Sequence, residues 1–234
     1  MATPNPLHPT NEAKTSSSEN SFILYSYFRS SASYRVRIAM NLKGLTYEYR
    51  AVHLLSNGGE QHSHEYERLN PSREVPTLIH RGRAIGQSMA ILDYLDQIHP
   101  EPRLFPEDPY QRALVVQACE IVNSGIQPVH NLRVLQELET RFGANQDQKN
   151  AWAVHWIQYG LNALEKFLAP HAGVYAFGSM VTAADCFLMP HFANADRYQV
   201  SLESYPTLAK LRKNYDSLDA FKRAAPGVQP DSPA

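Results

Sequence analysis

The order of apolar patterns in the first hundred residues restricts the fold of this chain more than any other feature. A β-rich apolar run comes first, followed by apolar residues at helical spacing and then by an alternating segment. Two short β-rich runs around a turn and a second helical pattern follow, with Gly44 placed to end the first helix and Ser88 to cap the second. These patterns occupy, in order, residues 22–25, 34–43, 45–54, 75–80, 83–85 and 89–99. The order β-α-β and then β-β-α predicts an α/β domain with the thioredoxin-like arrangement.

A proline-rich stretch separates this part of the chain from a second part. Four prolines lie within residues 100–109, and beyond them the apolar patterns are helical. Residues 152–168 indicate one long amphipathic helix, and residues 182–185 are a capping-box-like start of another. We therefore expect a thioredoxin-like domain, a linker and an all-α domain, at residues 21–100, 101–110 and 111–234. Residues 1–20 are rich in Pro, Ser, Thr and Asn, which predicts a disordered tail.

Charge and hydropathy argue against several classes of partner. The formal net charge of -1 gives no electrostatic attraction to a phosphate backbone, so nucleic acid is not an expected partner. No apolar run reaches the roughly 18 residues of a membrane span, so no membrane association is expected. Residues 1–20 contain neither the apolar core of a secretory signal nor the arginines of a mitochondrial transit peptide, so we expect a cytoplasmic protein.

The sequence offers neither a metal site nor a disulfide framework. Cys119 and Cys186 are the only cysteines, and both lie in apolar helical patterns, which favours buried, reduced thiols. His62 and His64 lie in a polar loop that contains no further ligand at a suitable spacing. We therefore expect both histidines to be solvated loop residues.

A run of hydroxyl side chains, at residues 30–33, lies between the first apolar run and the first helical pattern. A loop that enters a helix in this way aims backbone N–H groups and a partial positive charge at whatever occupies the loop. Because hydrogen bonds to a thiolate lower the pKa of the thiol, Ser30 is placed to activate a bound thiol. The alternative is that Ser30, Ser31 and Ser33 only cap the helix, a frequent role of serine at this position.

Two further motifs favour the ligand interpretation. In a thioredoxin-like domain, a proline at the position of Pro76 is usually cis, and it turns the N–H and C=O groups of Val75 toward an extended peptide. The structural alternative is a proline at a strand edge. Gln87 and Ser88 precede a helix N-terminus, which suits a ligand carboxylate. Together the motifs indicate a site for a small thiol peptide with free carboxylates.

Long motifs, all in the same order, resemble those of the zeta-class glutathione transferases, a family that includes maleylacetoacetate isomerase. The resemblance covers residues 22–233 and is carried by ILYSYFRSSASYRVRIAM, LNPSREVPTL, GQSMAILDYL, SGIQPVHNL, VTAADCFLMP, NADRYQVSLESYPTL and QPDSP. It implies a thioredoxin-like glutathione-binding domain followed by an all-α substrate-binding domain. It also implies a homodimer, with each active site in the cleft between the two domains of one subunit.

The chain departs from the family signature, which is similar to S-S-C-x-[WH]-R-V-R-I-A-L. Ala32 replaces the cysteine, and Tyr34 and Met40 replace two other residues of the signature. The resemblance implies that Ser30 stabilises the thiolate of glutathione. Ala32 cannot supply the thiol that the family places beside the reacting centre, so chemistry that depends on that cysteine is not expected here.

The resemblance also assigns the remaining site residues. The catalytic residues that it implies are Ser30, Ser31 and Arg197, and Arg197 matches the arginine that holds a substrate carboxylate. Arg35 is a second candidate for a carboxylate, against the alternative of a structural ion pair. The residues expected to contact glutathione are Ser30, Ser31, Ala32, Ser33, Tyr34, Arg35, Gln61, Val75, Pro76, Gln87, Ser88, Gln127 and Asn131.

Three other side chains have a catalytic interpretation and a structural one. Other glutathione transferases activate the thiol with a tyrosine near the end of the first strand, where this chain has Tyr25 and Tyr27. Their alternation with other residues is what a half-buried strand requires in any case, so we expect the activator to be Ser30. Asp185 is expected to be a structural cap and not a catalytic acid.

The resemblance implies a glutathione-dependent isomerase that converts maleylacetoacetate to fumarylacetoacetate in tyrosine and phenylalanine catabolism. Reversible addition of the thiolate permits rotation about the former double bond, so glutathione is a cofactor and no protein thiol is required. Two alternatives stay open. The same site can transfer glutathione to small α-halo acids or other electrophiles, or the chain can be a non-catalytic glutathione-binding scaffold.

Overall fold

The computed structural model describes residues 21–233, and the predicted tail at residues 1–20 lies outside them. The strands are β1 (Phe22–Ser26), β2 (Tyr47–Ala51), β3 (Thr77–His80) and β4 (Arg83–Gly86). The longer helices are α1 (Ser31–Leu42), α2 (His64–Leu69), α3 (Ser88–Ile98), α4 (Pro109–Glu120), α5 (Leu132–Phe142), α6 (Gln146–Leu168), α7 (Ala183–Arg197), α8 (Pro206–Tyr215) and α9 (Asp219–Ala224). A π-helix at Ile121–Ile126 and a 3-10 helix at Gln127–His130 connect α4 to α5.

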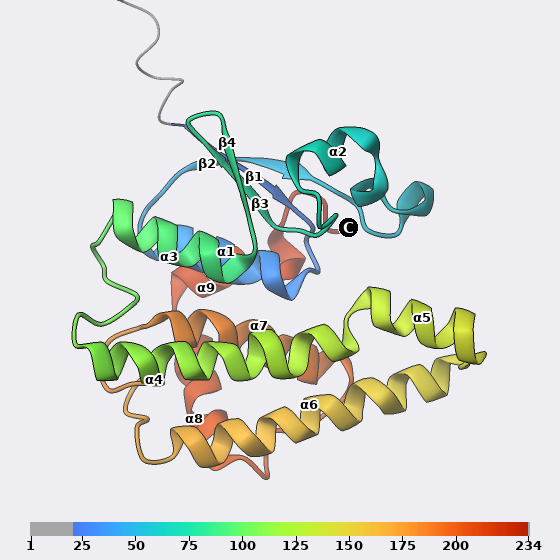
Figure 1. Ribbon diagram of the computed structural model, residues 1–234. Helices are drawn as coiled ribbons and strands as arrows, with labels where there is room; N and C mark the ends of the chain where they lie inside the picture. Colours follow the sequence, from blue (N-terminus) through green and yellow to red (C-terminus); the bar gives the residue numbers. More distant parts are fainter. Residues whose placement is uncertain (1–20, 234) are drawn as a thin grey trace, which may run out of the picture.

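The four strands form one sheet in the order β2-β1-β3-β4. β1 and β2 are parallel, with Leu24 opposite Tyr49, and the β1–β3 and β3–β4 pairs are antiparallel. α1 and α3 lie between this sheet and the helices of the second half of the chain (Figure 1). The expected β-α-β and β-β-α order is therefore confirmed, as is the combination of a thioredoxin-like part with an all-helical part.

α1 is buried on nearly all sides, because it packs against α3, α7 and α9 and lies beside the sheet (Figure 1). Its sequence nevertheless contains Arg35 and Arg37, which are 1% and 0% exposed. A buried guanidinium requires hydrogen-bond acceptors, so each of these arginines must be held by residues outside the helix. Gly44 follows the helix at φ +65°, the left-handed conformation expected of a residue that ends a helix.

The segment between α3 and α4 is held by one buried ion pair. Lys43 Nζ lies 2.8 Å from Asp96 Oδ1, and Asp96 also accepts hydrogen bonds from the backbone N–H groups of Leu104 and Phe105. α4 begins at Pro109, inside the stretch expected to be a linker. The domain boundaries drawn from the sequence stay predictions.

Two capping predictions have different outcomes. Ser88 does not cap α3: it is the first residue of the helix, and the N-cap is Gln87, which makes no side-chain capping bond. The Ser88 hydroxyl instead accepts a hydrogen bond from Arg35 at 3.0 Å. Asp185 is a structural residue as expected, because it accepts hydrogen bonds from the N–H and hydroxyl groups of Thr182 at the start of α7.

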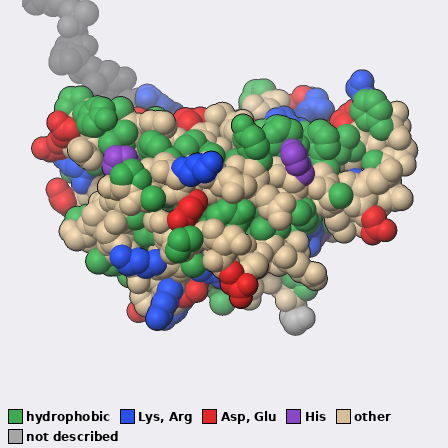
Figure 2. Space-filling model, turned by 90° about the horizontal axis from the view of Figure 1, so that it is seen from below, with side chains coloured by type: hydrophobic (Ala, Val, Ile, Leu, Met, Phe, Trp, Pro, Cys, Tyr) green, Lys and Arg blue, Asp and Glu red, His purple; other side chains and the backbone are tan. Residues whose placement is uncertain are grey.

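The two cysteines are buried and unpaired, as predicted. Burial raises the pKa of both thiols, Cys119 and Cys186, well above the ordinary value. Within residues 21–233, no group of three metal-ligating side chains gathers, and no helix has the length and apolar character to cross a membrane. Figure 2 shows basic and acidic side chains interspersed on the face seen from below, without a large patch of one sign there.

Gly160 permits the close packing of α6 against the π-helix. A Cβ atom at Gly160 would lie 2.0 Å from Cδ1 of the buried Ile126. We expect Gly160→Ala to lower the free energy of unfolding by about 1–3 kcal/mol, because the added methyl group overpacks this contact. Gly125→Ala is the matched control, since nothing lies within 4 Å of a Cβ there. Urea unfolding followed by circular dichroism measures both, and equal midpoints for wild type and Gly160→Ala would refute the packing argument.

Candidate functional site

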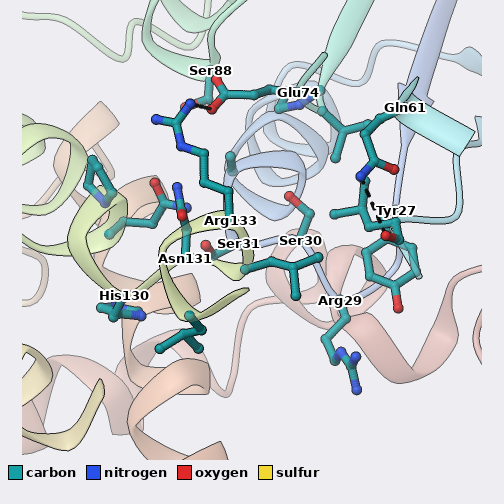
Figure 3. A pocket seen from close by; sticks show the side chains of 18 of the residues that line it. Tyr27, Arg29, Ser30, Ser31, Gln61, Glu74, Ser88, His130, Asn131 and Arg133 are labelled. Carbon is teal, nitrogen blue, oxygen red and sulfur yellow. Dashed lines mark hydrogen bonds and ion pairs between the residues drawn. The ribbon is translucent and has the colours of Figure 1, made fainter. Parts of the chain in front are cut away.

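A cavity of about 680 Å³ lies between the sheet-containing part and the helical part of the chain. Its wall comes from the N-termini of α1 and α3, the loop before β3, and helical segments between residues 123–137 and 194–198. Figure 3 shows Ser30 near the centre, with Asn131 and Arg133 on one side and Gln61 and Tyr27 on the other. The volume lies within the range of pockets that bind small ligands.

Most of the residues singled out in the sequence lie on this wall. The structure brings together Ser30, Ser31, Ala32, Arg35, Gln61, Val75, Pro76, Gln87, Ser88, Gln127, Asn131 and Arg197. The Val75–Pro76 peptide bond is cis, as expected. These residues come from six separate segments of the chain, so the fold gathers them at one place.

Ser33 and Tyr34 are the exceptions, and their side chains do not line the cavity. Both are buried, and the Tyr34 hydroxyl donates to the Phe221 carbonyl oxygen at 3.3 Å. Burial raises the pKa of Tyr34 to about 12, so its hydroxyl stays protonated. The reason is helical geometry: each residue turns about 100° from the last, so Ser33 and Tyr34 point away from the cavity, whereas Arg35 turns back toward it.

Ser30 caps α1, and its position is also compatible with the second role that the sequence left open. It is the N-cap of α1, and its Oγ accepts the Ser33 N–H at 3.2 Å. Because a hydroxyl has two lone pairs and one proton, this capping bond leaves the proton free to be donated into the cavity. The first N–H groups of α1, at Ser31 and Ala32, add the partial positive charge of a helix start. An anion beside Ser30 is therefore stabilised.

Arg35 organises the wall next to α3. Its Nη1 donates to Ser88 Oγ at 3.0 Å and to Asn123 Oδ1 at 2.8 Å, while its Nε and Nη2 have no partner within the described residues. Its guanidinium lies 4.2 Å from the ring centroid of Phe187. Burial lowers the pKa of Arg35 to about 10, so it keeps its charge at neutral pH. Since Ser88 accepts from Arg35, its own proton is directed to another acceptor.

A contact between the two halves of the chain crosses the cavity beside Ser88. Arg133 Nη1 on α5 lies 2.9 Å from Glu74 Oε1 (Figure 3), and Gln87 Nε2 donates to Glu74 Oε2 at 3.0 Å. Gln87 has φ +64°, an unusual value for a residue with a side chain. The α3 start is thus held in a defined orientation toward the cavity.

The cavity wall carries more basic than acidic side chains. Its charged residues are Arg29, Arg35, Arg73, Arg133 and Arg197, against Glu74 and Glu137. Within residues 21–233, Arg29, Arg35 and Arg197 make no ion pair. Arg197 ends α7, and its guanidinium lies 5.3 Å from the ring centroid of Tyr198. Three uncompensated cations suit a ligand or substrate with several carboxylates.

The tyrosines expected to be structural differ in their surroundings. The Tyr25 hydroxyl accepts a hydrogen bond from Arg50 on β2, away from the cavity. Tyr27 lines the cavity, but it is 4% exposed and belongs to a cluster with Val52, Tyr66 and Val75. The geometry therefore favours Ser30 over either tyrosine as the donor to a bound anion.

Sequence reasoning missed several residues of the wall, chiefly Asn123, Glu74, His130 and Arg133. Asn123 lies in the π-helix, and this irregular turn brings its side chain to Arg35. No local pattern in the sequence predicted the π-helix. The LNPSREVPTL motif did contain Glu74, but its partner Arg133 is 59 residues away, so the ion pair could not be read from spacing.

Two buried histidines should make the folded protein less stable in acid. Burial lowers the pKa of His130 to about 4 and of His191 to about 3, compared with about 6.5 in an unfolded chain. Both are neutral in the folded protein at neutral pH. Their contribution to the free energy of unfolding is therefore fully present above pH 6.5, and it is lost as the pH falls below that value. Below pH 6.5 we expect the free energy of unfolding to decrease by about 1.4 kcal/mol per pH unit for each histidine.

Urea unfolding between pH 7 and pH 5 measures this loss. His191→Phe keeps a buried ring of similar size and should reduce the slope, while the exposed His64 replaced by Gln should leave it unchanged. A slope that His191→Phe does not alter would show that this histidine is not the source.

Comparison with known proteins shows which families and proteins this chain is similar to. Models of the glutathione S-transferase N-terminal and C-terminal domains match residues 24–103 and 136–223. A maleylacetoacetate isomerase from Rattus norvegicus is 47% identical over 212 residues, which cover 91% of this chain and 95% of that protein.

Two solved structures show the same likeness in three dimensions. The holo structure of a maleyl pyruvate isomerase, described as a bacterial zeta-class glutathione S-transferase, has a TM-score of 0.87 and 42% identity, covering 90% of this chain and 100% of that one. A maleylacetoacetate isomerase from Anaeromyxobacter dehalogenans with glutathione bound in its active site has a TM-score of 0.82 and 43% identity, with coverages of 91% and 98%.

Proposed function

This chain belongs to the glutathione S-transferase family, and from that premise we propose that it is a zeta-class enzyme that uses glutathione to isomerise maleylacetoacetate to fumarylacetoacetate. The observation that carries the proposal is the position of Ser30. Its hydroxyl lies at the start of α1 on the cavity wall, with its proton free of the capping bond.

The residues of the wall fit glutathione, which carries a thiol, an amine, two carboxylates and two amides. Ser88 and the N-terminus of α3 offer donors for a carboxylate. Gln61 Oε1 is buried and has no hydrogen-bond partner among residues 21–233, and an ammonium or amide N–H would satisfy it. Asn131 uses its Oδ1 to cap α5, which leaves its amide hydrogens for a ligand. Val75 and Gln127, which also line the cavity, complete the proposed contacts.

Bound glutathione would supply a thiolate that adds reversibly to the conjugated double bond, so that rotation becomes possible before the thiolate is expelled. Ser30 would donate to the sulfur, and each unit by which it lowers the thiol pKa corresponds to about 1.4 kcal/mol. The N–H groups of Ser31 and Ala32 favour the same charge. Arg197 and Arg35 would hold carboxylates of the substrate and orient it.

No side-chain thiol of this chain is required by this scheme. Ala32 occupies the position where the family signature has a cysteine, and Cys119 and Cys186 are fully buried. All the nucleophilic chemistry is thus assigned to the bound tripeptide. What the chain contributes is charge stabilisation, orientation and a partly enclosed cavity.

The direct test mixes purified protein, glutathione and maleylacetoacetate. We expect fumarylacetoacetate to form faster than without protein, at a constant total thiol concentration. Consumption of glutathione in proportion to product, with an α-halo acid in place of maleylacetoacetate, would favour transferase chemistry. Failure of the protein to bind immobilised glutathione would favour a scaffold.

A second substrate is favoured by one of the comparisons. The structure with a TM-score of 0.87 is named as a maleyl pyruvate isomerase, so maleylpyruvate is a second candidate substrate. The ratio of the kcat/KM values for the two substrates decides between them. Preference for maleylacetoacetate by tenfold or more would support the assignment to tyrosine and phenylalanine catabolism.

Replacing Arg197 by alanine should separate substrate binding from glutathione binding. We expect KM for the keto acid to rise by about 10–100-fold, because a charge-assisted hydrogen bond contributes about 1.5–3 kcal/mol. The Kd for glutathione should stay within about twofold, since the proposed glutathione contacts do not include this residue. Arg197→Lys keeps the charge but not the bidentate geometry, so an intermediate KM is expected. Equal KM values for all three proteins would exclude Arg197 from the substrate site.

The assembly and the location of the protein are also proposals. Resemblance to the family supports a homodimer, and light scattering that gave the mass of one chain would contradict it. A cytoplasmic location is likewise a proposal. Fractionation of cells that express the full chain tests that location.

A further inference from the structure

The loop that carries Ser30 is held by the far end of the chain. This loop, residues 27–30, connects β1 to α1, and one turn contact within it joins the Ser30 N–H to the Tyr27 carbonyl oxygen at 3.0 Å. The Phe28 N–H donates to Oδ2 of Asp231 at 2.9 Å, across a sequence separation of 203 residues. Figure 1 shows the C-terminus returning to the sheet, beyond α9.

Asp231 is itself fixed by the sheet. The Tyr49 hydroxyl on β2 donates to Asp231 Oδ1 at 2.6 Å, so both carboxylate oxygens have a partner. Burial and this hydrogen bond together raise the pKa of Tyr49, which therefore remains a donor at all physiological pH values. Gln229 holds the segment before Asp231 by donating to the carbonyl oxygens of Arg223 and Ala225.

The opposite side of the same loop is held by Arg37. This buried guanidinium donates to the Tyr27 and Phe28 carbonyl oxygens at 3.3 and 2.9 Å, and to the Ala224 carbonyl oxygen at 2.9 Å. The residue Phe28 is thus held at its N–H by Asp231 and at its C=O by Arg37. Ser30 follows two residues later, so its position depends on this clamp.

We propose that Asp231 is a positioning residue of the isomerase, and that the C-terminal segment at residues 226–231 is a structural part of the active site. The proposal rests on the proposed function. Asp231 is not among the residues that line the cavity, and it acts through the backbone of Phe28 on the Ser30 hydroxyl. A shift of about 1 Å in a catalytic group is enough to cost about 10²-fold in rate, so a clamp on this loop has a measurable effect on the chemistry.

The test compares Asp231→Ala with Ser232→Ala in the full chain. Ser232 belongs to the same segment, but its side chain makes no hydrogen bond with the described residues. The readout is the pKa of the thiol of bound glutathione, measured from thiolate absorbance against pH, together with kcat. For Asp231→Ala we expect the thiol pKa to rise by about one unit and kcat at pH 7 to fall by about tenfold. Ser232→Ala should match wild type in both.

A purely structural role of Asp231 would change the melting temperature alone. Asp231→Ala with a wild-type thiol pKa and kcat would therefore overturn the proposal. Asp231→Asn keeps the shape and one acceptor oxygen, so it should give intermediate values, and it provides the same readouts if the alanine variant folds poorly. If wild type itself leaves the bound thiol at the pKa of free glutathione, the proposed function fails first, and this result is distinct from a failure confined to Asp231.

Discussion

Replacing Ser30 by alanine should lower kcat/KM for isomerisation by about 10²–10³-fold at pH 7. The expected size is that of losing one preorganised donor to a negatively charged centre. The Ser30 hydroxyl is placed for this role at the start of α1, where its oxygen caps the helix and its proton is free. Steady-state kinetics with saturating glutathione measures the effect, and a raised pH should restore part of the rate because more thiolate then forms without help.

The effect of Ser30 on helix stability must be separated from its effect on catalysis. Ser30→Ala also removes the acceptor for the Ser33 N–H, which costs about 1 kcal/mol of stability. Ser30→Asp retains a capping acceptor but brings no proton to donate at neutral pH. We expect Ser30→Asp to melt close to wild type and to be at least as inactive as Ser30→Ala. Activity that followed the melting temperature across these variants would mean that Ser30 serves only the helix.

Replacing Asp185 by alanine should lower the free energy of unfolding by about 3–5 kcal/mol. The carboxylate is fully buried and accepts from the Thr182 N–H at 2.7 Å, the Ala176 N–H at 2.8 Å and the Tyr215 hydroxyl at 2.5 Å. The variant leaves these donors without an acceptor in an interior where water cannot replace it. Urea unfolding gives the difference directly.

Two further variants show whether the loss comes from the buried network. Asp219→Ala removes an aspartate whose side chain is 84% exposed, and it should change stability by less than about 0.5 kcal/mol. Tyr215→Phe removes one of the donors to Asp185 and should cost about 1 kcal/mol. An Asp185→Ala midpoint equal to that of Asp219→Ala would contradict the structural role assigned to this residue.

Local patterns predicted the elements of the sheet-containing part well. β1 alternates buried and half-buried residues as a paired strand must, and Gly44 marks the end of α1. The hairpin of β3 and β4 followed from two β-rich runs around a glycine turn. These features depend on neighbours in sequence, so a single chain is enough to reveal them.

The faces of α1 were harder to predict. The resemblance grouped Ser33 and Tyr34 with Ser30 and Arg35 as glutathione contacts, but the helix turns Ser33 and Tyr34 into the interior. Ser88 was expected to cap α3, but its hydroxyl oxygen instead accepts a hydrogen bond from the buried Arg35 of α1. In each case the packing partner is far away in the chain, so the local signal was incomplete.

Contacts across long sequence separations were not predictable at all from the residues. The QPDSP motif contributed only to the resemblance, and its sequence does not indicate that Asp231 accepts a hydrogen bond from the Phe28 N–H. Likewise, the hydrogen bond from the buried Arg35 to Asn123 depends on a π-helical turn. Such contacts decide how the site is supported, and only the three-dimensional structure places them.

The most direct measurement is the pKa of the thiol of glutathione bound to the wild-type protein. The thiolate absorbs in the ultraviolet, so titration of the complex against free glutathione gives the value. If Ser30 and the start of α1 stabilise the negative sulfur, the bound thiol should have a pKa below about 7, compared with about 8.5 for an unperturbed thiol. A bound thiol that still titrated near 8.5 would contradict the account.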